Sequence, residues 1–567
     1  MTGGGMSRDE AVSELTGPGA PFEVVDEEVG GVHMRVFRNA PASLRAILEL
    51  TRAHGDRDFI VYRDERYSFA DHLSMVAGLA GWLQSTHGVQ KGDRVAIGMR
   101  NYPEWLFAFW ATQTRGAVAV PLNAWWTGAE MRYALEDSGA RVAVIDGERL
   151  ARIEAHLPDL GLEAVVVTRH DGDVPDGVEL WRDVRAQLDL SAILPDVDID
   201  PDDDATILYT SGTTGQPKGA IGSQRNHAMN FMNTALLGAV GSLMATGSAA
   251  PAAGAPAPAA LQTFPFFHIG GLSGLYVYTG FGGKLVLQYK WDLEEALELI
   301  QRERIVSLAA VPTIVRQILE SPLLEQYDIS SVAGIASGGA PVPPDLISRI
   351  DASFGSKVAP ANGYGLTETT SAVVMNAGQE YVGKASSVGR PVVVADVRVV
   401  DPASDADVPT GAIGELWFKG PNIVRGYWNK PDATTEAFTD GWFHTGDLGH
   451  VDGDGFVFVV DRIKDVVIRG GENVYCAEVE AALFEHPAVA DVAIVGIPHR
   501  ELGEEVAAVV QVKPGLEVSA TALQEHVSRR LARFKVPSHV VFREEPLPRT
   551  ATGKVLKREL RESLTAR

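Results

Sequence analysis

The chain has 567 residues, which is enough for three or four domains at about 150 residues each. Hydrophobic residues make up 45% and charged residues 22%, as in an ordinary globular protein. The 50 Lys and Arg residues against 74 Asp and Glu give a formal net charge of −24. Such an acidic surface argues against nucleic acid or an anionic membrane as the main partner. Any anionic substrate must therefore be held by local donors.

Cysteine usage and the first residues bear on the compartment. Cys476 is the single cysteine, which excludes an internal disulfide and a cysteine-based metal site and fits a reducing cytosol. The first 15 residues contain acids and no apolar run, so we expect no signal peptide. The expected location is cytoplasmic.

Residues 1 to about 20 are rich in glycine, and we expect a loose tail there. The stretch 21–37 alternates apolar and polar residues around Gly30 and Gly31, which predicts a hairpin. From about residue 43, helical patterns alternate with unbroken apolar runs such as 94–99 and 140–146. Such runs between helices predict a parallel sheet covered by helices on both faces, and hence the α/β class.

No charged residue lies between Arg225 and Lys284, and within this stretch 245–260 is an Ala/Pro/Gly run. Glycine and proline interrupt it, so we do not expect a membrane span. A flexible surface insertion beside a buried helix and strand is favoured. A lid, or a membrane-facing entrance for an apolar substrate, is the alternative. Peripheral membrane contact and oligomer formation stay open.

The composition changes again near Asp461. Beyond it, a helix at 477–487, strands at 489–497 and 504–512, a helix at 520–532 and a strand at 539–544 predict a compact α+β unit.

The most informative motif is ILYTSGTTGQPKGA at 207–220, where an apolar strand runs into hydroxyls and glycines. Such a loop lets backbone N–H groups approach an anion closely, and a lysine adds a point charge. The motif lacks the P-loop spacing, and GQEYVGKA at 378–385 ends in alanine where a P-loop needs a hydroxyl. The candidate phosphate-binding residues are Thr210, Ser211, Gly212, Thr213, Thr214, Gly215 and Lys218.

YTSGTTGQPKG resembles the signature of the adenylate-forming superfamily, which includes acyl-CoA synthetases, peptide-synthetase adenylation domains and luciferases. Further segments of that pattern follow in order: SGGAPV (337–342), NGYGLTETT (362–370), GWFHTGDLG (441–449), DRIKDVVIRGGENVYCAEVE (461–480) and PRTATGKVLKREL (548–560). The resemblance covers about residues 40–562. It implies a tail and hairpin (1–38), a large domain of parallel-rich sheets layered with helices (39–462) and a small mobile α+β domain (463–567).

The resemblance implies ATP, Mg²⁺ and coenzyme A, and site residues by position. Glu368 matches the Mg²⁺-binding acid and Thr367 a phosphate contact. Asp447 matches the acid that accepts hydrogen bonds from the ribose hydroxyls, and Arg462 an arginine near the ribose and phosphate. The nucleotide-site positions are Gly339, Ala340, Pro341, Gly363, Tyr364 and Gly365.

The C-terminal segments match the parts of the family that move. Lys554 matches the lysine that contacts the substrate carboxylate and the α-phosphate during adenylation, and Lys464 matches the hinge. Gly470 and Gly471 match the turn beside the pantetheine arm of CoA. Cys476 lies in an apolar context, so we expect a buried, unreactive thiol.

The segment 263–278 bears on the acid. Amino-acid-activating relatives carry Asp here, whereas this chain has Phe266, Phe267 and His268. An uncharged aromatic lining fits an apolar carboxylic acid. His268 matches a residue beside the acyl carboxylate, and a general-base role for it is the less favoured interpretation.

The sequence therefore predicts an ATP- and Mg²⁺-dependent acid–CoA ligase for an apolar acid, with a medium- or long-chain fatty acid favoured. An aryl acid, a separate carrier protein as acceptor, and luciferase-like oxidation are alternatives. A nucleotide-binding relative without catalysis is disfavoured because Glu368, Asp447 and Lys554 are all present.

Overall fold

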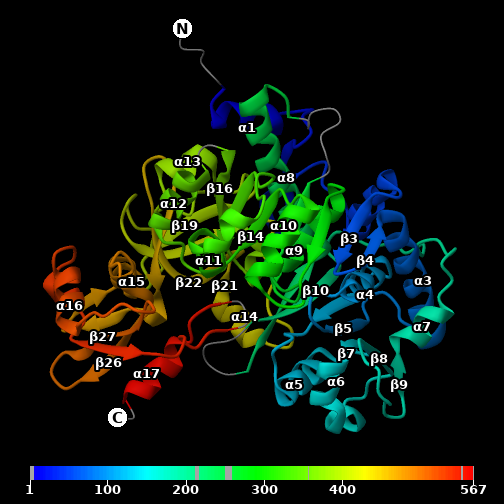
Figure 1. Cartoon of the computed structure of the whole chain (residues 1–567). Helices are drawn as coiled ribbons and strands as arrows, with labels where there is room; N and C mark the ends of the chain where they lie inside the picture. The colour runs from blue at the N-terminus through cyan, green and yellow to red at the C-terminus, as the bar shows by residue number, and fades with distance from the viewer. Residues whose placement is uncertain (1–5, 211–215, 250–257, 355–356, 551–552, 566–567) are drawn as a thin grey trace.

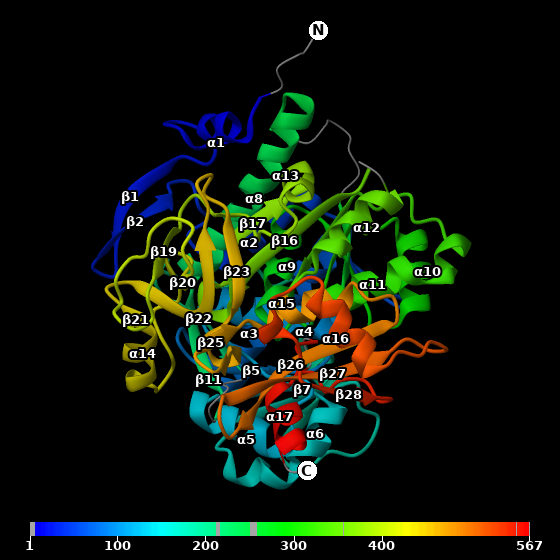
Figure 2. The same cartoon turned by 90° about the vertical axis from the view of Figure 1, so that its left-hand side faces the viewer.

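The computed structural model describes residues 6–210, 216–249, 258–354, 357–550 and 553–565. Figures 1 and 2 show a large layered body, with the orange and red C-terminal elements forming a smaller body against it. The α-helices are α1 (Arg8–Thr16), α2 (Leu44–Glu49), α3 (Phe69–His87), α4 (Pro103–Thr114), α5 (Gly128–Ser138), α6 (Gly147–Ile153), α7 (Trp181–Gln187), α8 (Gln224–Thr246), α9 (Ile269–Gly280), α10 (Leu293–Glu303), α11 (Pro312–Glu320), α12 (Pro344–Phe354), α13 (Gly378–Gly383), α14 (Pro431–Ala437), α15 (Cys476–Phe484), α16 (Ala520–Ser528) and α17 (Lys557–Thr565).

The first sheet has the strand order β11-β10-β6-β5-β7-β8-β9. Neighbouring strands from β10 to β9 pair in parallel, and β11 is antiparallel to β10. The apolar runs expected to form buried strands do so. The bounds are β5 (Arg94–Gly98), β6 (Val118–Pro121), β7 (Val142–Asp146), β8 (Ala164–Thr168), β9 (Val178–Leu180), β10 (Asp204–Thr210) and β11 (Lys218–Ser223).

The second sheet has the order β18-β17-β16-β15-β14-β12-β13-β3-β4 and is parallel from β16 to β3. The carboxyl ends of β12, β14, β15 and β16 therefore meet at one edge. The bounds are β3 (Asp58–Tyr62), β4 (Glu65–Ser68), β12 (Ala259–Gln262), β13 (Lys284–Leu287), β14 (Ser307–Ala310), β15 (Gly334–Gly338), β16 (Ala359–Leu366), β17 (Ser371–Ala377) and β18 (Arg390–Pro391). The predicted α/β class with parallel-rich sheets is confirmed.

A third, antiparallel sheet follows β18 and leads to the C-terminal body. Its strands are β19 (Asp396–Val400), β20 (Gly414–Lys419), β21 (Phe438–Thr439), β22 (Trp442–Val451) and β23 (Val457–Arg462). The C-terminal sheet consists of β24 (Val467–Arg469), β25 (Glu472–Val474), β26 (Val489–His499), β27 (Gly503–Val512) and β28 (His539–Arg543).

Alternation along β26 explains how the C-terminal sheet is covered. Val492 and Ile494 pack in one apolar cluster with residues of α15 and α16. Ala493 and Val495 pack in another with Leu560 of α17. Successive side chains of a strand point to opposite faces, so both faces of this strand are buried.

The N-terminal segment agrees with the prediction in part. The hairpin is confirmed as β1 (Val24–Val29) and β2 (Val32–Phe37), with positive φ at Gly30 and Gly31. The expectation of a loose tail is wrong from Arg8 onward, because α1 forms there. Ser7 and Glu10 cap this helix reciprocally, and its buried face packs against α8.

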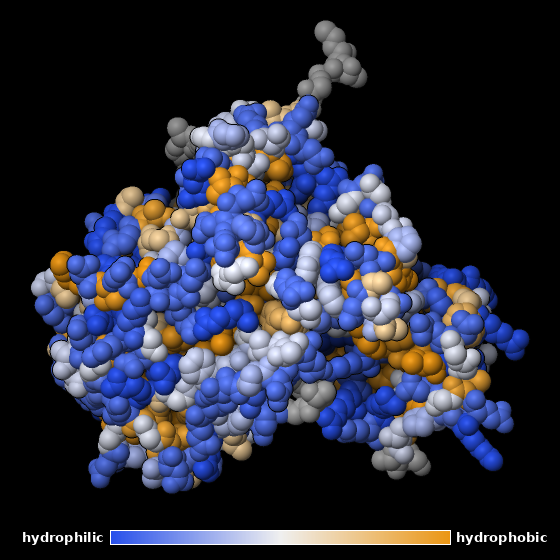
Figure 3. Space-filling model, turned by 180° about the vertical axis from the view of Figure 1, so that it is seen from behind, coloured by the Kyte–Doolittle hydropathy of each residue, from blue (hydrophilic) through white to orange (hydrophobic). Residues whose placement is uncertain are grey.

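Helix α8 forms the first part of the charge-free stretch and stands beside α1 at the top of Figure 1. Among the described residues it is the one helix long and apolar enough to cross a membrane, and half of its apolar window is buried in the protein. Residues 250–257 of the Ala/Pro/Gly run lie outside the described residues. Figure 3 shows a mostly hydrophilic surface on which hydrophobic residues form small groups.

Gly365 lies at the end of β16, which forms a hairpin with β17. A Cβ atom there would lie 1.9 Å from the backbone oxygen of Ser371, so the hairpin needs a glycine at this position. We expect Gly365→Ala to lower the free energy of unfolding by about 1–3 kcal/mol, because the backbone must shift. The control is Gly383→Ala in α13, where nothing lies within 4 Å of the added methyl group. Urea unfolding measures both. Equal stability of the two variants would contradict the close packing.

Candidate active site

The strand ends of the second sheet converge beside Gly339. A Cβ built on Gly339 would lie 3.3 Å from the ring of Phe264 and 3.7 Å from Val311. Phe264 follows β12 and Val311 follows β14, while Gly339 follows β15 with a φ of +75°. Ala340 and Pro341 come next in the chain. In open α/β sheets, ligands bind outside the carboxyl ends of such strands.

Asp447 on β22 joins two sheets. The residue is 4% exposed, and the Tyr364 hydroxyl of β16 donates to its Oδ2 at 2.7 Å. Arg462, paired with Asp447 across β22 and β23, places Nε 3.2 Å from Oδ1. Burial raises the pKa of Tyr364, so its phenol stays a protonated donor. A carboxylate has about four lone-pair sites, which leaves acceptor capacity for further donors.

Glu368 lies in a short 3₁₀ turn, Thr367–Thr369, between β16 and β17 and is 8% exposed. The Tyr427 hydroxyl donates to its Oε1 at 2.7 Å, and Lys218 Nζ lies 5.1 Å from the Tyr427 ring centroid. Burial raises the pKa of Glu368, and the Tyr427 hydrogen bond, Arg462 and Lys218 oppose that rise. A carboxylate and an ammonium group thus converge here.

Glu368 suits a magnesium ion that is shared with a phosphate. In the described residues, no group of three His, Cys, Asp or Glu side chains could hold a metal alone. Mg²⁺ commonly binds through one or two carboxylates together with substrate phosphates. A single buried carboxylate beside Lys218 fits that donor set.

Only two of the seven predicted phosphate-binding residues, Thr210 and Lys218, lie in the described part of the chain. Ser211, Gly212, Thr213, Thr214 and Gly215 lie outside the described residues. Thr210 and Lys218 at the two ends pair across β10 and β11, and Thr210 Oγ1 donates to the Lys218 carbonyl at 3.3 Å. The motif therefore connects two paired strands.

His268 is the N-cap of α9, and its Nδ1 accepts the Gly270 N–H at 3.1 Å. Burial lowers its pKa to about 4, so the ring is neutral at pH 7. The ring is nearly parallel to that of Phe264, with centroids 6.3 Å apart. Phe266, expected to line the acyl pocket, is fully buried against Trp105 and belongs to the core.

Lys554 belongs to the C-terminal body and lies near enough to Asp447 and Arg462 for their charges to act on it. Burial, with Arg462 adding to it, lowers its pKa to about 8, while Asp465 and Asp447 oppose the decrease. The preceding Gly553 would place a Cβ 3.5 Å from Val311 at the end of β14. The terminal segment therefore crosses from the C-terminal body onto the second sheet.

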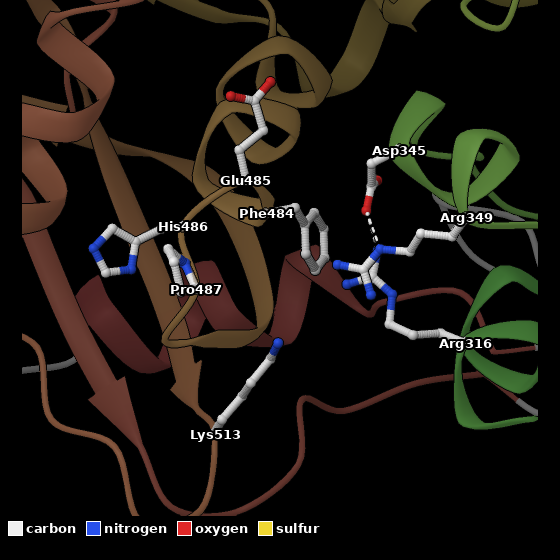
Figure 4. Close-up of a pocket in the computed structure, with 8 residues that line it drawn as sticks. All are labelled: Arg316, Asp345, Arg349, Phe484, Glu485, His486, Pro487 and Lys513. Carbon is white, nitrogen blue, oxygen red and sulfur yellow. Dashed lines mark ion pairs between the residues drawn. The ribbon is translucent and has the colours of Figure 1, made fainter. Parts of the chain in front are cut away.

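The two bodies also meet through α11, α12 and α15. Figure 4 shows the Phe484 ring pointing toward the neighbouring guanidinium groups of Arg316 and Arg349. The guanidinium carbon of Arg316 lies 5.1 Å from the Phe484 ring centroid, in cation–π range. Asp345 Oδ2 lies 3.8 Å from Arg316 Nη2 and 3.3 Å from Arg349 Nε. A cavity of about 390 Å³ lies among these residues.

The remaining predicted residues follow β23, in the C-terminal body. Lys464 is exposed in a 3₁₀ turn, Ile463–Asp465, between β23 and β24. Gly470 and Gly471 form the exposed turn between β24 and β25, with φ of +61° and +88°. Nothing lies within 4 Å of a Cβ built on Gly471. Cys476 is buried as expected, and its thiol donates to the Asp465 carbonyl at 2.9 Å.

Sequence reasoning missed Tyr427, which contacts Glu368 from 59 residues away. It also missed Thr370 and Ser371, which follow Glu368 with φ of +48° and +80°. Strained backbone of this kind gathers at functional sites. Thr370 lies within the motif NGYGLTETT, but the motif does not mark its backbone conformation, and Tyr427 meets Glu368 only because distant segments come together in the fold.

Comparison with known proteins agrees with this geometry. The chain is 37% identical over 496 residues to a feruloyl-CoA synthase of an Amycolatopsis species, covering 87% of this chain and 93% of the relative. It is 31% identical over 537 residues to a long-chain-fatty-acid–CoA ligase of Bacillus subtilis, and the match covers 90% of this chain and 92% of the relative. The structure of o-succinylbenzoate CoA synthetase from Bacillus subtilis, in complex with its acyl-adenylate intermediate, matches with a TM-score of 0.76. The two sequences are 29% identical, and the match covers 91% of this chain and 97% of the synthetase chain.

The family comparison covers both bodies. The sequence model of the AMP-binding enzyme matches residues 49–428, and that of the AMP-binding enzyme C-terminal domain matches residues 478–554. The first match alone spans more than half of the chain, and the chain therefore belongs to the AMP-binding enzyme family.

Proposed function

We propose that this chain, an ATP-dependent acid–CoA ligase of the AMP-binding enzyme family, activates an apolar carboxylic acid as its acyl-adenylate and transfers the acyl group to CoA. The observation that carries the proposal is that Lys554 is buried next to Gly553, whose Cβ would lie 3.5 Å from Val311 at the end of β14, and is near enough to Arg462 and Asp447 for their charges to shift its pKa. A donor from one body thereby reaches the candidate nucleotide site of the other.

In the first half-reaction the substrate carboxylate attacks the α-phosphorus of ATP, and pyrophosphate leaves with the electrons of the broken P–O bond. Catalysis of this kind is mostly positioning and charge neutralisation. We assign Lys554 to the carboxylate and the α-phosphate, where its ammonium group offsets the developing charge. Lys218 and the 210–215 segment hold the other phosphates.

The nucleotide-site assignment follows the strand ends. Asp447 accepts from the ribose hydroxyls, with Arg462 beside it. Glu368 holds Mg²⁺, which when bound neutralises phosphate charge, and Thr367 contacts a phosphate. The residues assigned to the adenine side are Gly339, Ala340, Pro341, Gly363, Tyr364 and Gly365.

The second half-reaction needs the CoA thiol at the same acyl carbon, with AMP as the leaving group. We propose that residues 463–567 rotate about Lys464 relative to residues 39–462. The Gly470–Gly471 turn, exposed in this arrangement, then borders the pantetheine passage. The arrangement described here, with Lys554 at the site, is the one suited to adenylation.

Two kinds of acid fit an uncharged, partly aromatic site. The fatty acid favoured by the sequence is supported by the long-chain-fatty-acid–CoA ligase relative, and an aryl acid by the feruloyl-CoA synthase relative. The neutral His268 packs beside the carboxylate in either case. CoA is the proposed acceptor because both relatives are named for CoA products.

The pKa of Lys554 gives a test of the adenylation step. The lysine is protonated below about pH 8, so kcat/KM for acid-dependent pyrophosphate exchange should be constant there and fall as pH rises through 8. Lys554→Ala should lose about 10²-fold or more and show no decline at that pH. A decline that persists unchanged in the variant would remove Lys554 from the step.

Gly471 gives a test of the rotation. Gly471→Leu should keep pyrophosphate exchange near wild type and lose most acyl-CoA formation, because leucine fills the thiol passage. A positive φ alone costs leucine about 1–2 kcal/mol. The matched control is Gly515→Leu, since Gly515 has a φ of +77° and equally open space in another turn of the same body. If both variants make acyl-CoA equally well, Gly471 does not border the passage.

A further inference from the structure

Lys554 lies where the chain folds back on itself before α17. The Thr550 N–H donates to the Lys554 carbonyl at 2.7 Å, and the backbones of Arg549 and Val555 form an isolated antiparallel bridge. These contacts join the residues before and after the turn, so the backbone that carries Lys554 belongs to one hydrogen-bonded unit.

The side chain of Arg549 joins this unit to β26. Its Nη1 donates to the Gly553 carbonyl at 2.5 Å, and its Nη2 donates to Asp491 Oδ2 at 2.5 Å. The Gly553 carbonyl belongs to the peptide group that links Gly553 to Lys554. The side chains of Arg549 and Asp491 are only 25% and 15% exposed, so solvent screens this pair less than an ion pair on the open surface. One guanidinium group therefore connects the backbone next to Lys554 with a strand of the C-terminal sheet.

Apolar contacts hold the same unit on the same face of β26. Leu547 and Val555 pack in one cluster with Ala493 and Val495. Alternate residues of a strand share a face, so Asp491 lies in one row with Ala493 and Val495. The ion pair extends this row of contacts. The unit around Lys554 is therefore attached to β26 and should move with the C-terminal body.

The position of this backbone decides what the Lys554 ammonium group can reach. A lysine stem is flexible and has no preferred geometry of its own, whereas the planar guanidinium of arginine can bond to two acceptors in fixed directions. A misplacement of a reacting group by about 1 Å can cost about 10²-fold in rate. A rigid connection between Gly553 and Asp491 therefore bears directly on a reaction that uses Lys554.

We propose that Arg549 is a positioning residue of the adenylation step. By bonding to the Gly553 carbonyl and to Asp491 together, it fixes the backbone from which Lys554 reaches the substrate carboxylate and the α-phosphate. The inference rests on the proposed function and gives Arg549 no contact with a substrate. Its effect should be confined to adenylation, because Lys554 leaves the site in the proposed rotation before the thiol reacts.

The experiment compares the two half-reactions in matched variants. Arg549→Gln should lower kcat for acid-dependent pyrophosphate exchange about 10- to 100-fold, while conversion of supplied acyl-adenylate to acyl-CoA stays within a few-fold of wild type. Arg549→Lys keeps the charge opposite Asp491 and should recover part of the exchange activity. The control is Arg561→Gln, which breaks another ion pair of the same sheet, between Arg561 of α17 and Glu504 of β27 at 2.8 Å. It should leave both half-reactions near wild type.

A double variant tests whether Arg549 acts through Lys554. In the Lys554→Ala background, Arg549→Gln should cause no further loss of exchange, because the lysine that it positions is absent. A further loss of 10-fold or more would overturn the inference, as would normal exchange in Arg549→Gln or an equal loss of both half-reactions.

Urea unfolding checks that each variant is folded. If Arg549→Gln does not fold, Asp491→Asn replaces it, because the amide keeps an acceptor but removes the charge, and it should show the same split between the half-reactions. An active wild type with an unaffected Arg549→Gln would contradict this inference alone. A wild type with neither acid-dependent exchange nor acyl-CoA formation would contradict the proposed function, and the inference would fail with it.

Discussion

The arrangement of the two bodies depends on the buried carboxylate of Asp447. It accepts from Tyr364 of the second sheet, pairs with Arg462 at the end of the third sheet and faces Lys554 from the C-terminal body. A chain with a net charge of −24 cannot attract a polyphosphate through its overall field. Cations must therefore be gathered locally, and Asp447 stabilises two of them where the strand ends meet.

The same residues bear on the two half-reactions that we propose for this site. Lys554 is held by charge and burial, without a covalent or metal link, and burial lowers its pKa to about 8. The second contact, Phe484 over Arg316, is a cation–π contact of the kind that contributes about 1 kcal/mol. A contact of this strength is compatible with the rotation that we propose for residues 463–567.

Much of the fold and part of the site could be predicted from sequence. Apolar runs such as 94–99 formed the expected strands because buried parallel strands need them, and the motifs that carry Asp447 and Lys554 lie near enough for the two charges to interact. The Tyr427–Glu368 and Tyr364–Asp447 contacts span 59 and 83 residues and depend on how sheets meet, which no local pattern encodes. Helix α1 was missed because, apart from the Ser7–Glu10 cap, its sequence has little apolar periodicity. Phe266 was misplaced because an apolar side chain fits a core and a pocket equally well.

In the proposed mechanism, the C-terminal body must leave the adenylation arrangement before the thiol can react. The most direct measurement crosslinks Arg316→Cys to Phe484→Cys with a short bis-maleimide that contains a reducible disulfide bond. The native Cys476 is fully buried and should not interfere. We expect the crosslinked protein to keep pyrophosphate exchange, to lose acyl-CoA formation and to regain it on reduction, whereas the treated single-cysteine variants should be unaffected. A crosslinked protein that makes acyl-CoA at the uncrosslinked rate would contradict the proposed rotation.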